Sequence, residues 1–294
     1  MYCNQIIENM GHDTMMVFSN QNLSNNFLDR DEIKTRCPFA YATNPTNPKV
    51  SEKYVQANTS TVIDDMAKLG WYVVDAKQKR PRKNSSGIQS YHMIAFQNPT
   101  IKIVKDNAIE AFPRIILTNS HDGMNSFRFM IGIYRLVCSN GLIIADENLE
   151  NLVIRHINYT FDDLRKLVAK TIEELPRYVE ITNGMRTTEL SKYAKYDFAL
   201  KALKIRKNLP ESEVLSISEA TLQDLLTPTR KEDEGDSLWT VYNVLQEKLI
   251  KGGTSVETGK ENKLRKMRPV KSFVRDLSVN HDLFDLAKTY LDVA

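Results

Sequence analysis

The stretch from Pro113 to Leu142 constrains the fold more than any other part of this chain of 294 residues. Two runs rich in β-branched and aromatic residues, Arg114–Thr118 and Phe127–Val137, flank a cluster of turn-forming residues, Asn119–Gly123. Runs bounded in this way by Asn, Asp, Ser and Gly indicate strands joined by a tight loop. A second turn signal, Asn140-Gly141, follows, because both residue types tolerate the positive φ of a hairpin turn. The sequence therefore predicts the middle of an antiparallel meander.

Two arginines, Arg128 and Arg135, interrupt the second of these strands. Seven positions apart, they fall on opposite faces of an ideal strand, because side chains alternate with period two. A bulge near Gly132 would instead bring both arginines onto one face. Both arrangements are compatible with the sequence.

The same stretch carries a family resemblance. A Ser-His-Asp-Gly turn at residues 120–123 leads into a strand that ends in Arg135-Leu136-Val137-Cys138-Ser139-Asn140. A second motif, LWTVYNVLQE at residues 238–247, is followed by LIKGG at residues 249–253. In these motifs the chain resembles a phage- and plasmid-type family catalogued as a domain of unknown function (the 932 type). The resemblance covers residues 60–292 and implies a mobile-element context without an assigned activity.

Composition is typical of a globular protein in a reducing compartment. Hydrophobic residues make up 41% of the chain and charged residues 26%, both ordinary values. The three cysteines, Cys3, Cys37 and Cys138, are odd in number and widely spaced, which argues against a disulfide framework. The N-terminus lacks the pattern of a signal peptide, and no apolar run reaches the length of a membrane span. We therefore expect a soluble protein without membrane partners, located in the cytoplasm of a host cell.

The pattern of elements predicts three regions and an α+β fold. Residues 1–59 are polar and Pro-containing and are expected to form a loosely structured segment or an arm on a neighbouring subunit. Residues 60–183 are expected to form an antiparallel β-meander packed by a long helix, in β-β-β-α order. Residues 184–294 are predicted to be mainly helical, with a basic segment at 260–275.

Capping and turn signals place the other elements. The predicted strands are Trp71–Ala76, Gln89–Gln97, Ile101–Val104 and Leu152–Ile157. The predicted helices begin near Thr61 with Asp64 as its capping partner, at Thr160 with Asp163, at Leu190, at Ser218, at Leu238 and near His281. Gly70 should end the first helix, Pro176 should bend or end the second, and Gly252-Gly253 should end the helix from Leu238.

Two basic segments are the candidate nucleic-acid-binding features. The loop at residues 77–87 holds five cations and no acid, and residues 260–275 hold seven cations against one acid, Glu261. Such clusters bind phosphates by Coulomb attraction and counterion release, although a solvated surface gives the same pattern. With the two strand arginines, the candidate residues are Lys77, Lys79, Arg80, Arg82, Lys83, Arg128, Arg135, Lys263, Arg265, Lys266, Arg268 and Lys271.

Catalytic and metal signals are weaker. His121 and Asp122 with Cys138 contain the residue types of a cysteine nucleophile, its base and an orienting carboxylate. Turn chemistry explains the Ser-His-Asp-Gly sequence equally well. His92, His121 and His156 lack the short paired spacing of metal ligands. No nucleotide-binding motif is present, so we expect no cofactor and no metal.

A polar stripe marks the predicted helix that begins at Leu238. Trp239, Asn243, Gln246 and Glu247 fall on one side of that helix. Two roles are compatible with this spacing: hydrogen bonding across a packing or subunit contact, or contact with a ligand.

These observations lead to three hypotheses of different class. The first is a non-enzymatic protein that binds or anneals single-stranded DNA in recombination, because the β-β-β-α order looks like the core of the Rad-fifty-two and RecT groups. The second is an interaction protein that inhibits a host defence system or nuclease. The third is an enzyme that uses His121, Asp122 and Cys138. We further expect a homo-oligomer, since an open antiparallel sheet leaves an unpaired edge.

Overall fold

The chain divides into two compact units, Met1–Arg177 and Tyr178–Ala294. The helix α4, Phe161–Thr187, contains both this boundary and the one expected after residue 183. Within the described residues, no helix combines the length and the apolar character needed to cross a membrane. The computed structural model describes residues 14–18, 27–43, 58–79, 90–106, 108–122, 127–135, 141–144, 153–154, 160–210, 217–258 and 263–291.

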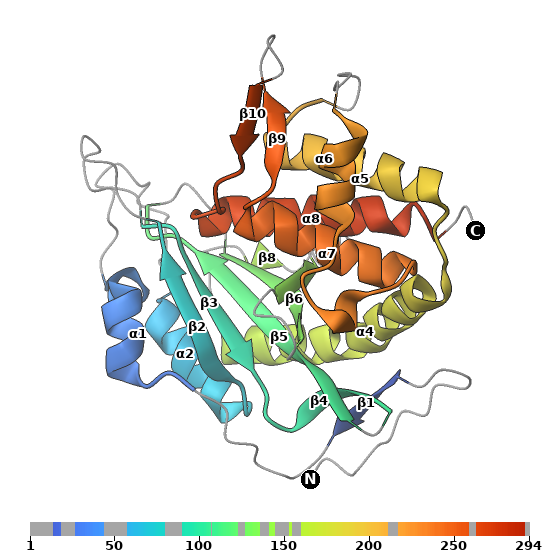
Figure 1. The fold of residues 1–294 in the computed structure, drawn as a ribbon. Helices are drawn as coiled ribbons and strands as arrows, with labels where there is room; N and C mark the ends of the chain where they lie inside the picture. Colours follow the sequence, from blue (N-terminus) through green and yellow to red (C-terminus); the bar gives the residue numbers. More distant parts are fainter. Residues whose placement is uncertain are drawn as a thin grey trace. The chain divides into compact units, whose positions relative to one another are not determined.

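The first unit is built on an antiparallel sheet with the order β1-β4-β5-β3-β2, in which β6 also pairs with β5 and carries β7 and β8 (Figure 1). The strands are β1 (Thr14–Phe18), β2 (Tyr72–Gln78), β3 (His92–Gln97), β4 (Ile101–Lys105), β5 (Ala108–Asn119), β6 (Phe127–Arg135), β7 (Gly141–Ile144) and β8 (Val153–Ile154). The predicted α+β class and the antiparallel meander are confirmed.

The pairing of β5 with β6 decides the positions of the two strand arginines. The register runs without a break from Thr118 opposite Arg128 to Ala111 opposite Arg135. The bulge considered at Gly132 is therefore wrong, and the two arginines lie on opposite faces of the sheet. Arg128 is exposed, whereas Arg135 is buried.

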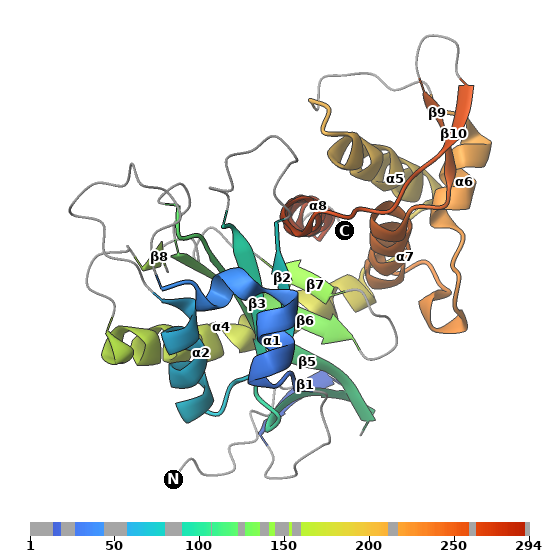
Figure 2. The same cartoon turned by 90° about the vertical axis from the view of Figure 1, so that its left-hand side faces the viewer.

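The core of this unit lies on the face of the sheet that α2 (Thr59–Lys68) and α4 cover (Figures 1 and 2). Ile94, Leu117 and Phe129 form one row across β3, β5 and β6 on that face, and all three are buried. Burial of such a row is the main favourable term that holds the helices on the sheet, at about 25 cal/mol per Å² of apolar area.

The predicted helix starts and stops are partly correct. Asn58 is the N-cap of α2, so the predicted cap at Thr61 is wrong, while Gly70, at a φ of 82°, follows the end of that helix. Thr160 caps α4 as predicted: its side-chain oxygen accepts from the Asp163 N–H over 3.2 Å, and its hydroxyl donates to the Asp163 carboxylate over 2.6 Å. Pro176 does not end α4, which continues to Thr187. Tertiary burial of the side chains around a proline offsets the one backbone hydrogen bond that the proline removes.

Regular secondary structure is also present within residues 1–59, for which the sequence predicted a loosely structured segment. β1 pairs with β4 of the same chain and lies along that strand. The helix α1 (Arg30–Arg36) begins with a capping box: the Asp29 carboxylate accepts from the Glu32 N–H, and the Glu32 carboxylate accepts from the Asp29 N–H. A short 3₁₀ turn, Pro38–Tyr41, follows.

The second unit is mainly helical, as predicted. Its elements are α5 (Lys192–Lys207), α6 (Glu219–Leu226), the 3₁₀ turn Lys231–Asp233, α7 (Leu238–Lys251), the hairpin of β9 (Ser255–Thr258) and β10 (Lys263–Lys266), and α8 (Phe273–Lys288). Ser218 caps α6 and Gly252 ends α7, both as predicted. The β9–β10 hairpin and the early start of α8 were not predicted.

Candidate functional site

A buried polar network lies where β5 ends, on the face of the sheet that α2 covers. Asn119 Nδ2 donates to Thr59 Oγ1 over 2.9 Å, and Thr59 Oγ1 lies 2.7 Å from His92 Nε2. His92 Nδ1 lies 2.7 Å from the Ser90 carbonyl oxygen. The network thus connects the start of α2 to the first residue of β3 and the last residue of β5. Its members, each no more than 2% exposed, are Thr59, Ser90, His92, Asn119, Ser120, His121 and Asp122.

The hydrogen bonds define the protonation of His92. The Ser90 carbonyl oxygen only accepts, so Nδ1 carries the hydrogen and Nε2 accepts from the Thr59 hydroxyl. Both ring nitrogens are therefore satisfied by a neutral imidazole. Burial lowers the pKa of His92 to about 3.

His121 and Asp122, two of the catalytic candidates, belong to this network. The His121 N–H donates to Ser90 Oγ over 2.7 Å, and Ser120 Oγ donates to Asp122 over 2.6 Å. The His121 ring lies 5.1 Å from the His92 ring. Such complete burial is typical of a hydrogen-bonded support for a loop, since a catalytic base needs access to its substrate.

The other partners proposed for chemistry are not brought to this network. Cys138 and His156 lie outside the described residues. Among the residues that the structure does describe, no group of three or more His, Cys, Asp or Glu side chains is placed to hold a metal ion. Burial raises the pKa of the Cys37 thiol to about 12, which leaves it protonated and unreactive at neutral pH.

The polar stripe on α7 serves internal packing. Asn243 Nδ2 donates to the Trp239 carbonyl oxygen over 2.6 Å, and Gln246 Nε2 donates to Asn280 Oδ1 on α8 over 2.6 Å. Glu247 lies 2.5 Å from the Arg230 guanidinium and 2.8 Å from Lys251. Burial raises the pKa of Glu247, but hydrogen bonds from Lys251 and a neighbouring threonine outweigh this effect and bring the pKa below its ordinary value. Of the two roles compatible with the sequence, the contacts support packing.

The first basic segment begins on the face of the sheet opposite α2. Lys77, Met93, Thr118 and Arg128 are paired in succession across β2, β3, β5 and β6, so their side chains share one row and one face. Lys77 and Arg128 are both exposed. The carboxylate of Asp75 lies 3.0 Å from Lys77 Nζ and offsets part of its charge.

The other candidates near this segment differ in their positions. Arg135 is 7% exposed and lies on the opposite face of the sheet, so the two candidates Arg128 and Arg135 do not share one surface. Lys79 is exposed just after β2. Arg80, Arg82 and Lys83 lie outside the described residues.

The second basic segment forms β10 and the chain that follows it. Four of its cations are exposed, and within the described part of the chain no carboxylate forms an ion pair with any of them: Arg265, Lys266, Arg268 and Lys271. Lys263 lies opposite Thr258 in the hairpin, and only its backbone is described. The register places Arg265 opposite Val256, so their side chains share one face of the hairpin. Val256 is buried and attaches the hairpin to the unit, while the Arg265 side chain remains exposed.

Several other cations of this unit have partners. Lys192, Lys195, Lys201, Arg230 and Lys251 each lie within 4.0 Å of a carboxylate. Arg275 donates to the carbonyl oxygens of Ile205 and Arg206 at the end of α5, which satisfies backbone acceptors that a helix terminus leaves open. Arg275 belongs to the basic segment in sequence but is structural.

The sequence signal for the hairpin is weak. Ser255–Thr258 and Lys263–Lys266 each hold one strongly apolar residue, Val256 and Leu264, and Gly259 lies between the two runs. The density of cations in the second run obscures this pattern. Lys207 Nζ donates to the Glu257 carbonyl oxygen, and Ser218 donates to the Glu257 carboxylate, so the hairpin is fixed to α5 and α6.

Comparison with known proteins supplies the family. The family model described as "Domain of unknown function (DUF932)" matches residues 48–282. The chain belongs to this family. Two Escherichia coli (strain K12) proteins, UPF0380 protein YfjQ and UPF0380 protein YafZ, are each 27% identical to it over 266 residues, which is 90% of this chain and 92% of the relative. No solved structure matches the chain. The resemblance inferred from the two motifs is therefore confirmed at the level of the DUF932 family.

Proposed function

We propose that this DUF932 protein binds single-stranded nucleic acid, with DNA as the favoured ligand, through the exposed cations of β10 and of the chain after it. One observation carries the proposal: four exposed cations that form no ion pair among the described residues, Arg265, Lys266, Arg268 and Lys271, lie close together in the chain, whereas Lys192, Lys195, Lys201, Arg230 and Lys251 are paired. Unpaired surface cations that lie close together attract a polyanion and release its counterions.

The helix α7, the most buried of this unit's helices, is not placed to read a groove. A helix that enters the major groove exposes one face to the bases. Nine residues of α7 are buried, on all sides of the helix, so α7 cannot present such a face. A cationic hairpin instead contacts phosphates without regard to sequence and leaves the base edges free to pair. Annealing of strands in the recombination of a mobile element is the finer form of the proposal.

The test is a salt-titrated binding assay with a fluorescent oligothymidylate. The quadruple variant Arg265→Gln, Lys266→Gln, Arg268→Gln, Lys271→Gln should bind more weakly at low salt. The dependence of log K on log salt should also flatten, by about 0.7 for each phosphate that the variant no longer neutralises. A matched control removes four other exposed cations with the same change in net charge: Lys34, Arg36, Lys170 and Lys231.

The control variant is expected to bind as the unmodified protein does. Equal loss of affinity in both variants would show that net charge, and not the hairpin, determines binding. Absence of binding by the unmodified protein at low salt would reject the proposal outright.

A further inference from the structure

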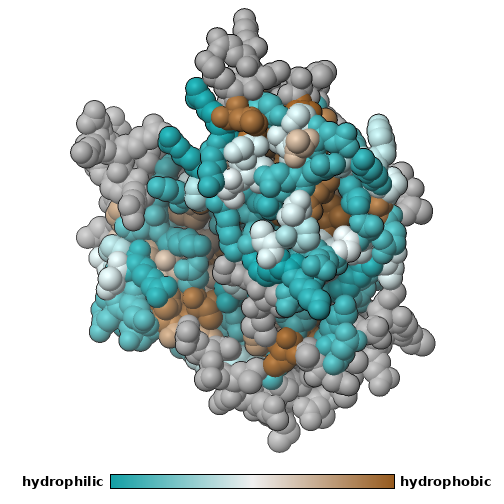
Figure 3. Space-filling view, viewed as in Figure 1, coloured by the Kyte–Doolittle hydropathy of each residue, from teal (hydrophilic) through white to brown (hydrophobic). Residues whose placement is uncertain are grey.

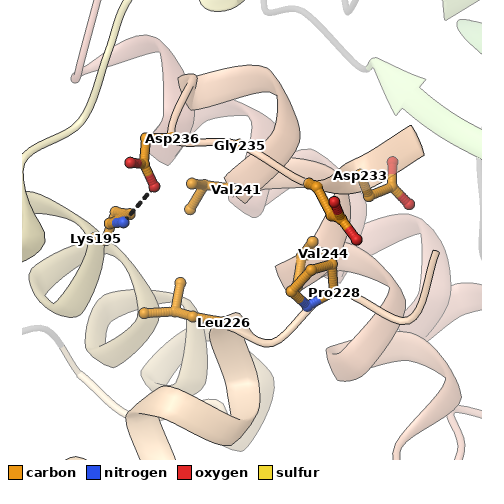
Figure 4. Close-up of a pocket in the computed structure, with 9 residues that line it drawn as sticks. Lys195, Leu226, Pro228, Asp233, Gly235, Asp236, Val241 and Val244 are labelled. Carbon is orange, nitrogen blue, oxygen red and sulfur yellow. Dashed lines mark hydrogen bonds and ion pairs between the residues drawn. The ribbon is translucent and has the colours of Figure 1, made fainter. Parts of the chain in front are cut away.

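The second unit contains a cavity of about 210 Å³ between α5, the end of α6, the loop before α7, and α7 itself (Figure 4). The apolar part of its lining, here called the floor, consists of Leu226, Pro228, Val241 and Val244, and the rest of the lining is polar or glycine. Figure 3 shows hydrophobic surface at the level of α6 and α7, framed by hydrophilic residues. A concave apolar floor of this kind accepts one apolar side chain.

The rim of the cavity carries more acids than bases. Asp233, Glu234 and Asp236 line it, against one cation, Lys195. Lys195 lies 2.5 Å from Asp236, and Arg230, outside the lining, lies 3.2 Å from Asp233. Glu234 is exposed and, within the described residues, has no ion pair. The ligand that fits is therefore an apolar side chain with one cation beside it.

The chain itself presents such a group on β10. Leu264 is 64% exposed, and its neighbours in sequence are Lys263, Arg265 and Lys266. Because side chains alternate along a strand, Leu264 and Lys266 project from one face of β10, and Arg265 projects from the other. An exposed leucine beside a lysine matches an apolar floor beside a glutamate.

The cavity of the same chain is out of reach of its own hairpin. Glu257 of β9 accepts hydrogen bonds from Ser218 and Thr221, at the first turn of α6, whereas Leu226 of the cavity is the last residue of α6. Direct pairing of β10 with the β10 of another copy is opposed by repulsion between their cations. The occupant must therefore approach from another molecule with its leucine directed into the cavity.

We propose that Leu264 of one copy of this chain docks in the cavity of a second copy, with Lys266 beside Glu234. The two contacting surfaces differ, so the contact is head-to-tail and can repeat into a ring or a filament. Lys266 belongs both to this contact and to the proposed nucleic-acid surface, whereas Leu264 and Glu234 belong to this contact alone. No nucleic acid takes part in the contact, so it is tested in the absence of nucleic acid.

The experiment measures the mass of the full-length protein by sedimentation velocity across a concentration series without nucleic acid. The unmodified protein should associate as its concentration rises. Leu264→Asp should weaken association at least about tenfold, because a charge replaces the buried apolar group. Val274→Asp is the matched control: Val274 is 37% exposed and does not line the cavity, so its substitution should leave association unchanged.

A charge exchange tests the ionic part of the contact. Glu234→Lys and Lys266→Glu should each weaken association, and the double variant should recover it, because the pair is restored with its signs reversed. Both residues are exposed, so the variants are expected to fold. A monomeric mass of the unmodified protein at every concentration, an unchanged mass series for Leu264→Asp, or a double variant as weak as the single ones would each overturn the proposal.

Discussion

At the scale of single residues, the spacing of His121 and Asp122 suggested chemistry that their surroundings do not support. Sequence spacing contains no information on burial, and both side chains are almost fully enclosed. The residue that organises their surroundings is His92, which contacts Thr59 across 33 positions of sequence. Contacts of this range arise from the pairing of β3 with β5 and from the position of α2, neither of which a local pattern specifies.

The lowered pKa of His92 predicts that the protein loses stability in acid. Its folded pKa, about 3, is below the ordinary value of 6.5, because burial disfavours the imidazolium. Above pH 6.5 the residue is neutral in both states and contributes no pH dependence. As the pH falls from 6.5 towards 3, only the unfolded chain takes up the proton, so the free energy of unfolding should fall by up to about 1.4 kcal/mol per pH unit.

Urea unfolding of the unmodified protein and of His92→Gln between pH 8 and pH 4.5 measures this effect. The variant should be less stable at pH 7, because it disrupts the buried network, and should lose less stability on acidification. Between pH 7 and 8 the difference between the two proteins should stay constant, which is the internal control. Parallel curves below pH 6 would contradict the assignment of this proton to His92.

At the scale of elements, the sequence predicted helix ends correctly where neighbouring residues determine them. It failed where packing against distant residues determines them. The Thr160 cap, the Ser218 cap and the Gly252 stop depend on neighbouring residues and were predicted correctly. The Asp29 capping box had the same local character but lay in a polar segment with weak periodicity. Pro176 was expected to bend or end α4, and the helix continues past it because packing outweighs the one backbone hydrogen bond that proline removes.

The contact between α7 and α8 predicts strong coupling between Gln246 and Asn280. The Gln246 amide donates to Asn280 Oδ1 over 2.6 Å in a buried setting. Gln246→Leu leaves that acceptor without its amide donor, at a cost of about 1–3 kcal/mol in the free energy of unfolding. The double variant with Asn280→Leu should be destabilised by less than the sum of the two single effects, since no polar partner is then left behind.

A double-mutant cycle in urea measures the coupling, which should be about 0.5–3 kcal/mol. Leu238 is buried on α7 and Leu283 is buried on α8. The pair Leu238→Ala and Leu283→Ala therefore provides a comparison that removes no side-chain hydrogen bond. Strictly additive effects for Gln246 and Asn280 would show that the hydrogen bond does not stabilise the contact between the two helices.

At the scale of the whole molecule, the sequence predicted the fold class and the positions of the basic segments better than the roles of individual cations. The α+β order follows from periodicity and turn chemistry, which are local. Whether a cation is available depends on partners far along the chain. Arg275 contacts Ile205 at a separation of 70 positions in the sequence. Arg135 is buried because the unbroken pairing of β5 with β6 places it on the face of the sheet opposite Arg128. Neither relation can be derived from composition.

The last prediction concerns the two basic segments together. If both segments bind nucleic acid, substitution of glutamine in the first segment (Lys77, Lys79, Arg80, Arg82 and Lys83) should flatten the salt dependence of binding. Substitution of the second segment should do the same. Because counterion release is proportional to the number of phosphates neutralised, the change in slope for the combined variant should equal the sum of the two separate changes. The oligothymidylate assay between about 50 and 200 mM salt, a range over which affinity changes strongly, provides the measurement. A combined variant with the same slope as the second-segment variant would confine the binding surface to the hairpin. A combined variant that still binds with the unmodified slope would assign both segments to ordinary solvated surface.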